Sequence, residues 1–213
     1  MYFLVNIQSR DSILEFLKKR GLSDFKIKHS ITVANLALKI ADEIMKDEIK
    51  INKQIVEVAG LLHDVGLSIF GEIDFEKEMA NPAPEHCVSG AKIVLEAGYP
   101  RIIAECIECH ELWSGDEARE IGFPEPIKED YFPKTWEAKA LAYADLVVFV
   151  YALGYDILDD PEVVIKASYL YRNECFKKVT GKCIEKDHAI IKRVDKFNSE
   201  MIKYFKREFI PNP

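Results

Sequence analysis

Apolar residues recur every three to four positions along most of the chain, which is the period of a helix buried on one face. The last such stripe is typical, with Ile190, Val194, Phe197 and Met201 in register. No segment alternates between apolar and polar residues in the manner of a strand. The period predicts helices over residues 10–20, 24–46, 53–65, 85–97, 100–110, 134–153, 160–180 and 186–207. The sequence therefore predicts an all-α bundle of about eight helices.

Capping residues mark the ends of several predicted helices. Ser9, Ser23 and Asn52 stand where N-caps are expected, and Gly21 and Gly66 stand where a C-terminal glycine is expected. These residues set three of the predicted helix starts and two of the predicted ends.

Residues 111–133 are predicted to be a long loop without regular structure, because glycines and prolines interrupt the helical period there. Loops of this length are more often functional than idle. The loop carries four aromatic residues that either stack on a substrate base or anchor the loop itself: Trp113, Phe123, Tyr131 and Phe132.

Length and charge narrow the class of protein. A chain of 213 residues fits one domain over 1–213, with a core at 23–153 and a C-terminal helical extension at 154–213 that could cap the bundle or form a homodimer. The net charge of −7 argues against a binder of nucleic acid duplex. The chain shows no signal segment, no apolar run long enough for a membrane and an odd number of cysteines, five. We therefore expect a cytoplasmic protein without a membrane partner.

Several polar residues fall on stripes that should face the core. His29 shares its stripe with Val33, and His63 and Asp64 follow two leucines on the most apolar helix. His110 continues the stripe of Ile103, Cys106 and Ile107, and Asp145 lies among Ala138, Leu141, Ala142, Val148 and Phe149. A buried carboxylate needs a proton, a charged partner or a metal ion. Imidazoles around a divalent metal would satisfy both carboxylates together.

Each of these residues also has a simpler interpretation. A single histidine on an apolar stripe is more often hydrogen-bonded in the core than bound to a metal, His86 could be exposed at a helix start, and Asp145 could pair with an arginine. Four of the five histidines nevertheless form one ordered series, and only His188 lies outside it, in a charged context typical of a surface.

The ordered series resembles a known family. The motif HDVG at residues 63–66 is similar to the HDIG variant of the HD superfamily of metal-dependent phosphohydrolases. Residues 85–111 resemble the two-histidine insertion of its dinuclear members, and residues 138–147 resemble its terminal aspartate helix. The resemblance covers about residues 23–150 and implies a single HD domain, a helical bundle whose core binds metal.

The resemblance also implies a role for each residue of the series. His29, His63, Asp64 and Asp145 would hold one metal ion, while His86 and His110 would complete a second site that Asp64 bridges. Asp64 or Asp145 would orient a water molecule that attacks a small phosphomonoester, nucleotide or dinucleotide. Nitrogen and carboxylate ligands suit one or two divalent transition metals, namely iron, manganese, cobalt or zinc.

One departure from the family concerns a lysine. Some dinuclear relatives have a lysine soon after the HDIG glycine, where this chain has Leu67 and Ser68. A cation that contacts the substrate phosphate would then come from elsewhere. The sequence offers these candidates, each of which could equally be a surface residue: Lys92, Arg101, Arg119, Lys134 and Lys139.

Three other functions remain open on the sequence. Residues 106–110 match the C-x-x-C-H pattern of covalent haem attachment, but they also continue an amphipathic helix. Cys106 would then lie in the core, and Cys109 near the metal site. The same ligand series could hold a di-iron centre that activates oxygen, and a non-catalytic, nucleotide-sensing HD module is the third alternative.

Overall fold

The computed structural model describes residues 8–71, 83–183 and 189–210. In this part of the chain the structure is helical apart from one two-stranded sheet, which confirms the predicted all-α class. The α-helices are α1 (Arg10–Lys19), α2 (Asp24–Met45), α3 (Lys53–Leu62), α5 (His86–Glu96), α6 (Arg101–Glu108), α7 (Gly115–Glu120), α8 (Trp136–Ala152), α9 (Val163–Thr180) and α10 (Ala189–Met201). Short 3₁₀ segments are η1 (Val65–Ile69), η2 (Ile202–Tyr204) and η3 (Arg207–Phe209), and the strands are β1 (Trp113–Ser114) and β2 (Asp130–Tyr131).

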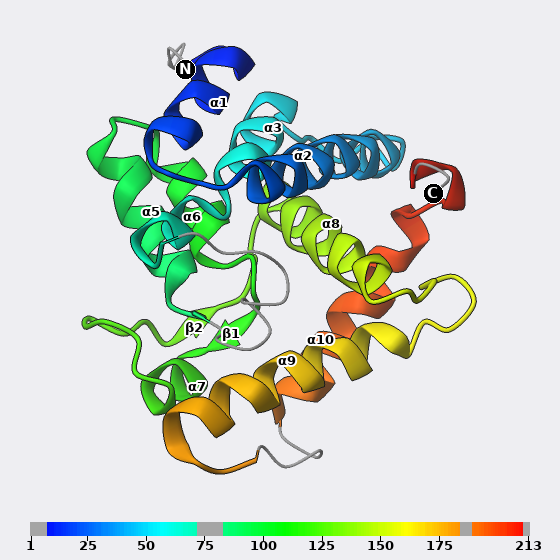
Figure 1. The fold of residues 1–213 in the computed structure, drawn as a ribbon. Coiled ribbons are helices and arrows are strands. Elements are labelled where there is room, and N and C mark those ends of the chain that lie inside the picture. The colour runs from blue at the N-terminus through cyan, green and yellow to red at the C-terminus, as the bar shows by residue number, and fades with distance from the viewer. Residues whose placement is uncertain (1–7, 72–82, 184–188, 211–213) are drawn as a thin grey trace.

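Helices α2, α3 and α8 form the centre of the bundle (Figure 1). The buried face of α2 includes Val33, Ala37, Ile40 and Ile44, which are spaced as one helical stripe. Helix α8 is apolar on most sides because α2 covers one side and α9 packs against another. The candidate polar residues of α2 and α8 thus face each other across the interior.

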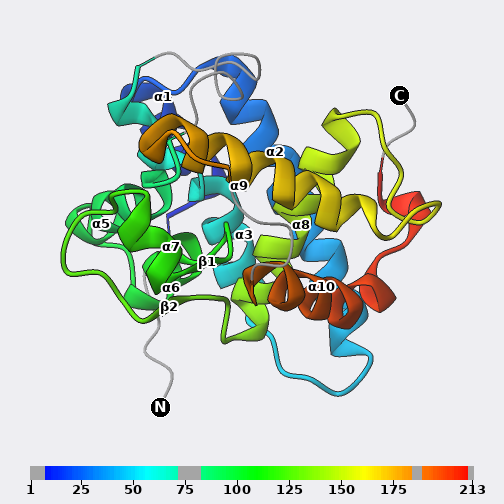
Figure 2. The ribbon, with the colours of Figure 1, turned by 90° about the horizontal axis from the view of Figure 1, so that it is seen from below.

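The C-terminal helices share the apolar core of the bundle. Val164 of α9, Val194 and Phe197 of α10 and Phe205 belong to the same buried cluster as the residues of α2 and α8. Seen from below, α9 crosses α8 (Figure 2). Residues of α9 therefore lie close enough to α8 to contribute to a site built on it.

Local sequence sets four helix ends as predicted. The side chains of Ser9, Ser23 and Asn52 accept hydrogen bonds from backbone N–H groups in the first turns of α1, α2 and α3. Gly21 has φ = +86°, the left-handed conformation expected after α1. Gly66 is different: α3 ends at Leu62, and Gly66 lies within η1, so its predicted role as a C-terminal glycine is wrong.

The prediction of an unstructured loop at residues 111–133 is also wrong. It contains α7 and the sheet, in which Trp113 pairs with Tyr131. A reciprocal capping box starts α7, since Ser114 and Glu117 each accept from the other's backbone N–H. Strands of two residues are too short to produce an alternating pattern, so the apolar and polar positions did not indicate them.

The loop aromatics are anchors of this segment. Trp113, Phe123 and Tyr131 are buried in a second apolar cluster, together with Cys175 and Phe176 of α9. Phe132 packs against the same cluster. The burial of Trp113, Phe123 and Tyr131 favours the anchoring interpretation over base stacking.

Two expectations concern other parts of the chain. His188 and the start of the helix predicted over 186–207 lie outside the described residues, whereas α10 and η2 account for its later part. Among the residues that the structure describes, no helix combines the length and hydrophobicity that crossing a membrane requires.

Candidate metal centre

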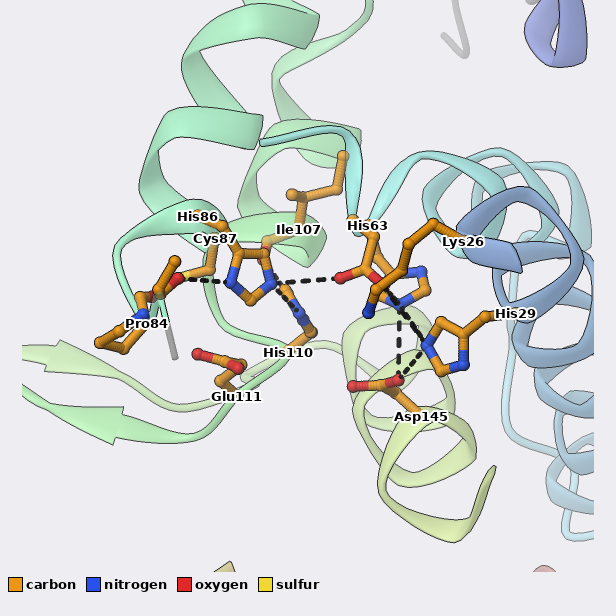
Figure 3. A network of polar contacts seen from close by, with 12 residues as sticks. Lys26, His29, His63, Pro84, His86, Cys87, Ile107, His110, Glu111 and Asp145 are labelled. Carbon is orange, nitrogen blue, oxygen red and sulfur yellow. Dashed lines mark hydrogen bonds and ion pairs between the residues drawn. The ribbon is translucent and has the colours of Figure 1, made fainter. Parts of the chain in front are cut away.

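The six residues of the predicted ligand series meet at one place in the bundle (Figure 3). They come from five segments: α2, the junction of α3 with η1, the start of α5, the turn after α6, and α8. In the order of the chain they are His29, His63, Asp64, His86, His110 and Asp145.

One half of the cluster joins α2, α3 and α8. His29 Nε2 lies 3.1 Å from Asp145 Oδ1, and His63 Nε2 lies 3.4 Å from the same oxygen. The two imidazole Nε2 atoms are 3.2 Å apart. Two nitrogens and one carboxylate oxygen thus converge on one point, as in a metal site.

The other half joins α5 with the turn after α6. His86 Nε2 lies 3.1 Å from His110 Nε2, and the carboxylate of Glu111 is close enough for all three side chains to ligate one ion. Figure 3 shows Glu111 beside this pair of histidines. Glu111 was not among the residues predicted from the sequence.

Asp64 lies between the two halves. Its Oδ2 is 3.5 Å from His63 Nε2 and 3.6 Å from His29 Nε2, whereas its Oδ1 is 3.2 Å from His86 Nε2. The two oxygens of one carboxylate therefore face different histidine pairs. This is the arrangement that a carboxylate bridging two ions requires.

Three of the histidines are oriented by the same local contact. The Nδ1 atoms of His63, His86 and His110 donate to the backbone carbonyls of Gly60, Ala83 and Ile107, each three residues earlier, at 2.9, 2.8 and 2.6 Å. A carbonyl can only accept, so Nδ1 carries a proton, and in the neutral imidazole Nε2 is the nitrogen whose lone pair can bind a metal ion. Metal-bound histidines in proteins are usually fixed by such a contact of the second ring nitrogen.

Gly66 explains how two of the segments come close enough. A Cβ atom added at Gly66 would lie 1.9 Å from the backbone oxygen of His86 and 2.7 Å from the nitrogen of Gly90. Only glycine allows η1 to pack against α5 at this distance. The glycine of the HDVG motif thus brings Asp64 within reach of His86.

The charges of the cluster are strongly coupled. Burial alone would lower the pKa of His63, but Asp64 and Asp145 raise it to about 9. Burial would likewise lower the pKa of His86, but Glu111 and Asp64 raise it to about 10. Burial and the neighbouring charges of His86 and His63 lower the pKa of His110 to about 3.

The carboxylates show the opposite response. Burial would raise the pKa of Asp64, but Lys26 and the surrounding histidines hold it well below its usual value. His63 and His29 do the same for Asp145 against the effect of burial. For Glu111 burial prevails and its pKa is raised. In the metal-free cluster the ionised aspartates thus stabilise the protonated imidazoles of His63 and His86, whereas His110 is neutral.

This donor set fits divalent metal ions. His86 and His110 both use Nδ1 to donate to carbonyls, so the 3.1 Å contact of their Nε2 atoms needs a proton or a cation between two lone pairs. Imidazole and carboxylate ligands without thiolate suit iron, manganese, cobalt and zinc. Cys109 lies outside the cluster, since its Sγ contacts the carbonyls of Glu105 and Cys106 within its own helix.

A lysine that the sequence analysis missed belongs to the site. Lys26 is only 4% exposed, and its Nζ lies 3.1 Å from Asp64 Oδ2. It precedes His29 by three residues and so lies on the same face of α2. That spacing was visible in the sequence, but a lysine on a helix face ordinarily indicates a solvated surface.

The five basic residues predicted to contact phosphate lie elsewhere. Lys92, Arg101 and Arg119 form ion pairs with acidic residues of their own helices, at side-chain exposures of 77%, 83% and 60%. Lys139 pairs with Glu200, and Lys134 lines a separate cavity beside Cys106 and Cys109. None of the five lines the cavity at the histidine cluster.

That cavity extends from the cluster toward α8 and α9. It has a volume of about 100 Å³. Its lining includes Lys26 and all of the candidate ligands except His63. The other lining residues are mainly apolar, with three polar side chains among them: Phe25, Leu112, Leu146, Phe149, Ala152, Ser168, Tyr171 and Arg172.

Comparisons with known proteins give relatives in archaea. The chain is 30% identical over 186 residues to an uncharacterized protein of Methanocaldococcus jannaschii. This match covers 86% of this chain and 91% of the relative. It is 31% identical over 144 residues to a tRNA (cytidine(56)-2'-O)-methyltransferase of Picrophilus torridus. That match covers 67% of this chain but only 37% of the methyltransferase.

The solved structures that match this chain are distant in sequence. Two structures of the HD domain of the L. monocytogenes phosphodiesterase PgpH are each 19% identical to this chain, with TM-scores of 0.49 and, for the complex with cyclic-di-AMP, 0.46. The first match covers 90% of this chain and 97% of the PgpH chain. The match to the complex covers 94% of this chain and 100% of the PgpH chain. The sequence profile of the HD domain matches residues 27–148, more than half of the chain and the whole span of the histidine and aspartate series. The protein is therefore a member of the HD-domain family.

Proposed function

We propose that this protein is a phosphohydrolase with a dinuclear metal centre, acting on a small phosphate ester. The observation that carries the proposal is the position of Asp64, whose two oxygens face two separate groups of metal-ligating side chains. His29, His63 and Asp145 would hold one ion, and His86 and His110 the other, with Glu111 as a further ligand. When bound, two such ions supply Lewis acidity and a water molecule of lowered pKa.

The side chains around the cluster support this chemistry. Lys26 contributes a buried ammonium group beside Asp64, where it would neutralise part of the charge of an entering phosphate. Asp145 lines the cavity from α8 and is held ionised by its neighbours, so it would accept a hydrogen bond from the attacking water and orient it. Lys26 would thus supply a cation that this chain does not have directly after the HDVG motif.

The shape of the cavity favours a small ester. Leu146 and Phe149 of α8 form its apolar wall beside Asp145, and Ser168 and Tyr171 of α9 add hydroxyl groups. These side chains would exclude water from the reacting phosphate and contact an aromatic or aliphatic leaving group. A phosphomonoester or nucleotide with one apolar or aromatic group fits such a lining.

The test begins with metal content. Purified protein loaded with Mn²⁺ should hold two ions per chain by elemental mass spectrometry and should hydrolyse members of a panel of aryl phosphates, nucleoside monophosphates and cyclic dinucleotides. His63→Ala should abolish turnover, whereas Lys92→Ala, a change on the exposed surface, should leave it unaltered. Absence of turnover on the whole panel with two ions bound would refute the proposal. Turnover that requires oxygen would indicate oxygenase chemistry instead.

A further inference from the structure

Arg172 of α9 is a buried cation directly behind the candidate metal centre. It is 2% exposed, although arginine is among the residues least often buried. One terminal nitrogen donates to the backbone oxygens of Glu111 and Leu112, at 2.9 and 2.6 Å. The other donates to Ser168 Oγ at 3.0 Å. The guanidinium thus joins α9 to the residues that directly follow His110.

A second set of contacts fixes the guanidinium itself. Its Nε lies 3.4 Å from Oε1 of Glu117, a carboxylate that is also buried. Its central carbon lies 4.4 Å from the ring centroid of Trp113, a cation–π contact. A planar group held at this many points has one orientation, which a lysine could not reproduce.

The segment that Arg172 holds has an unusual backbone. Leu112 has φ = +62°, a conformation that residues other than glycine rarely adopt. A residue in this conformation is stable only when contacts with its surroundings hold it there. Here Arg172 holds it, because its guanidinium donates to the carbonyl of Glu111 before the turn and to that of Leu112. The turn directs the Glu111 side chain toward His86 and His110.

The Glu111 carboxylate is linked to the same arginine through Trp113. The indole Nε1 donates to Glu111 Oε2 at 2.8 Å, and the guanidinium packs on the face of that indole. Arg172 therefore restrains both the backbone of Glu111 and the partner of its side chain.

We propose that Arg172 is a positioning residue for Glu111 and thereby makes α9 a part of the second half of the metal centre. This inference rests on the proposed function, because it assigns Glu111 to a bound ion. A residue that only packs the core would affect metal binding whether or not Glu111 is present. Arg172 should affect metal binding only when Glu111 is present.

The experiment compares Mn²⁺ binding in Arg172→Met, Glu111→Ala and the double variant, measured by calorimetry and by elemental analysis. Arg172→Met should weaken the second ion about tenfold to a hundredfold, the usual effect of losing a group that orients a ligand, and leave the first ion unchanged. The double variant should bind no more weakly than Glu111→Ala alone, since coupled residues are not additive. Arg172→Lys should lie between Arg172→Met and the wild type.

Arg193 of α10 offers a matched control. It also forms an ion pair, with Asp130 at 2.9 Å, and packs on an aromatic ring, that of Phe132. Its side chain is 42% exposed and belongs to neither half of the metal centre. Arg193→Met should bind both ions as the wild type does.

Hydrogen exchange of the metal-free protein gives a readout independent of loading. Peptides covering residues 110–115 should exchange faster in Arg172→Met, with α2 and α3 unchanged. Unaltered exchange of these peptides would overturn the inference, whether or not the wild-type chain binds metal. Failure of the wild-type chain to bind metal would be a separate result, and it would refute the proposed function. Wild-type affinity for the second ion in Arg172→Met, or additive losses in the double variant, would overturn it as well.

Discussion

Replacing Asp64 by asparagine tests the electrostatics of the cluster before any metal is added. The amide has the shape of the carboxylate but no charge. It would leave the Lys26 ammonium, whose side chain is 5% exposed, without the oxygen that now lies 3.1 Å from it. It would also remove a carboxylate that raises the pKa of His63 and His86.

The structure sets the size of the effect. Removing one partner of a buried ion pair costs about 3–5 kcal/mol, because the remaining charge stays desolvated. Loss of the Asp64 charge lowers the pKa of His63 and His86 and lets them release their protons, so most of the remaining cost should come from the Lys26 ammonium. Adding Lys26→Met removes the remaining charge, and the double variant should recover about 2 kcal/mol or more relative to additive behaviour.

The assay is urea unfolding of the metal-free protein at pH 8, with the two single variants and the double variant. The pair formed by Lys53 and Asp42 serves as the control, since its side chains are 45% and 53% exposed. The corresponding variants, Asp42→Asn and Lys53→Met, should change the unfolding free energy by less than about 1 kcal/mol.

Additive losses would contradict this expectation. If Asp64→Asn and Lys26→Met together cost the sum of their separate effects, then Asp64 does not stabilise the Lys26 ammonium and Lys26 is not part of the site. A loss for Asp64→Asn no larger than that for Asp42→Asn would contradict it equally.

Three more predictions concern the same residues. The pKa values of about 9 for His63 and about 10 for His86 lie above the ordinary 6.5. The protonated histidines should therefore stabilise the metal-free protein fully below pH 6.5, and this contribution should fall as the pH rises to 10. Urea unfolding across this range measures it, and an unfolding free energy that does not change with pH would contradict the prediction. His110→Ala should lower bound Mn²⁺ from two ions to one, whereas Cys109→Ser should keep both. Lys26→Met should reduce turnover at least tenfold in a phosphatase assay, while Lys139→Ala should match the wild type.

Much of the fold could be read from the sequence because it depends on local rules. The helical period places helices at the observed positions, and Ser9, Ser23 and Asn52 cap them through contacts three residues away or fewer. The six-residue series was visible for a related reason: histidines and aspartates on apolar stripes are conspicuous wherever the stripe faces the core. The roles of Gly66 and of residues 111–133 were misjudged, because close packing against α5 and burial against α9 leave no local signal.

The charges that surround the series could not be predicted from the sequence, because they come from distant segments of the chain. Lys26 and Asp64 are 38 residues apart, and Arg172 and Glu111 are 61 residues apart, so each pair is made by the packing of helices. In the sequence Lys26 and Arg172 resemble the many cations of helix surfaces, and Glu111 resembles the acidic residues around it. Burial in the folded protein distinguishes these residues from those of the surface, because a charge removed from water must find a partner in the interior. The sequence thus determined the series of histidines and aspartates, and the packing of the helices selected the charged neighbours that surround it.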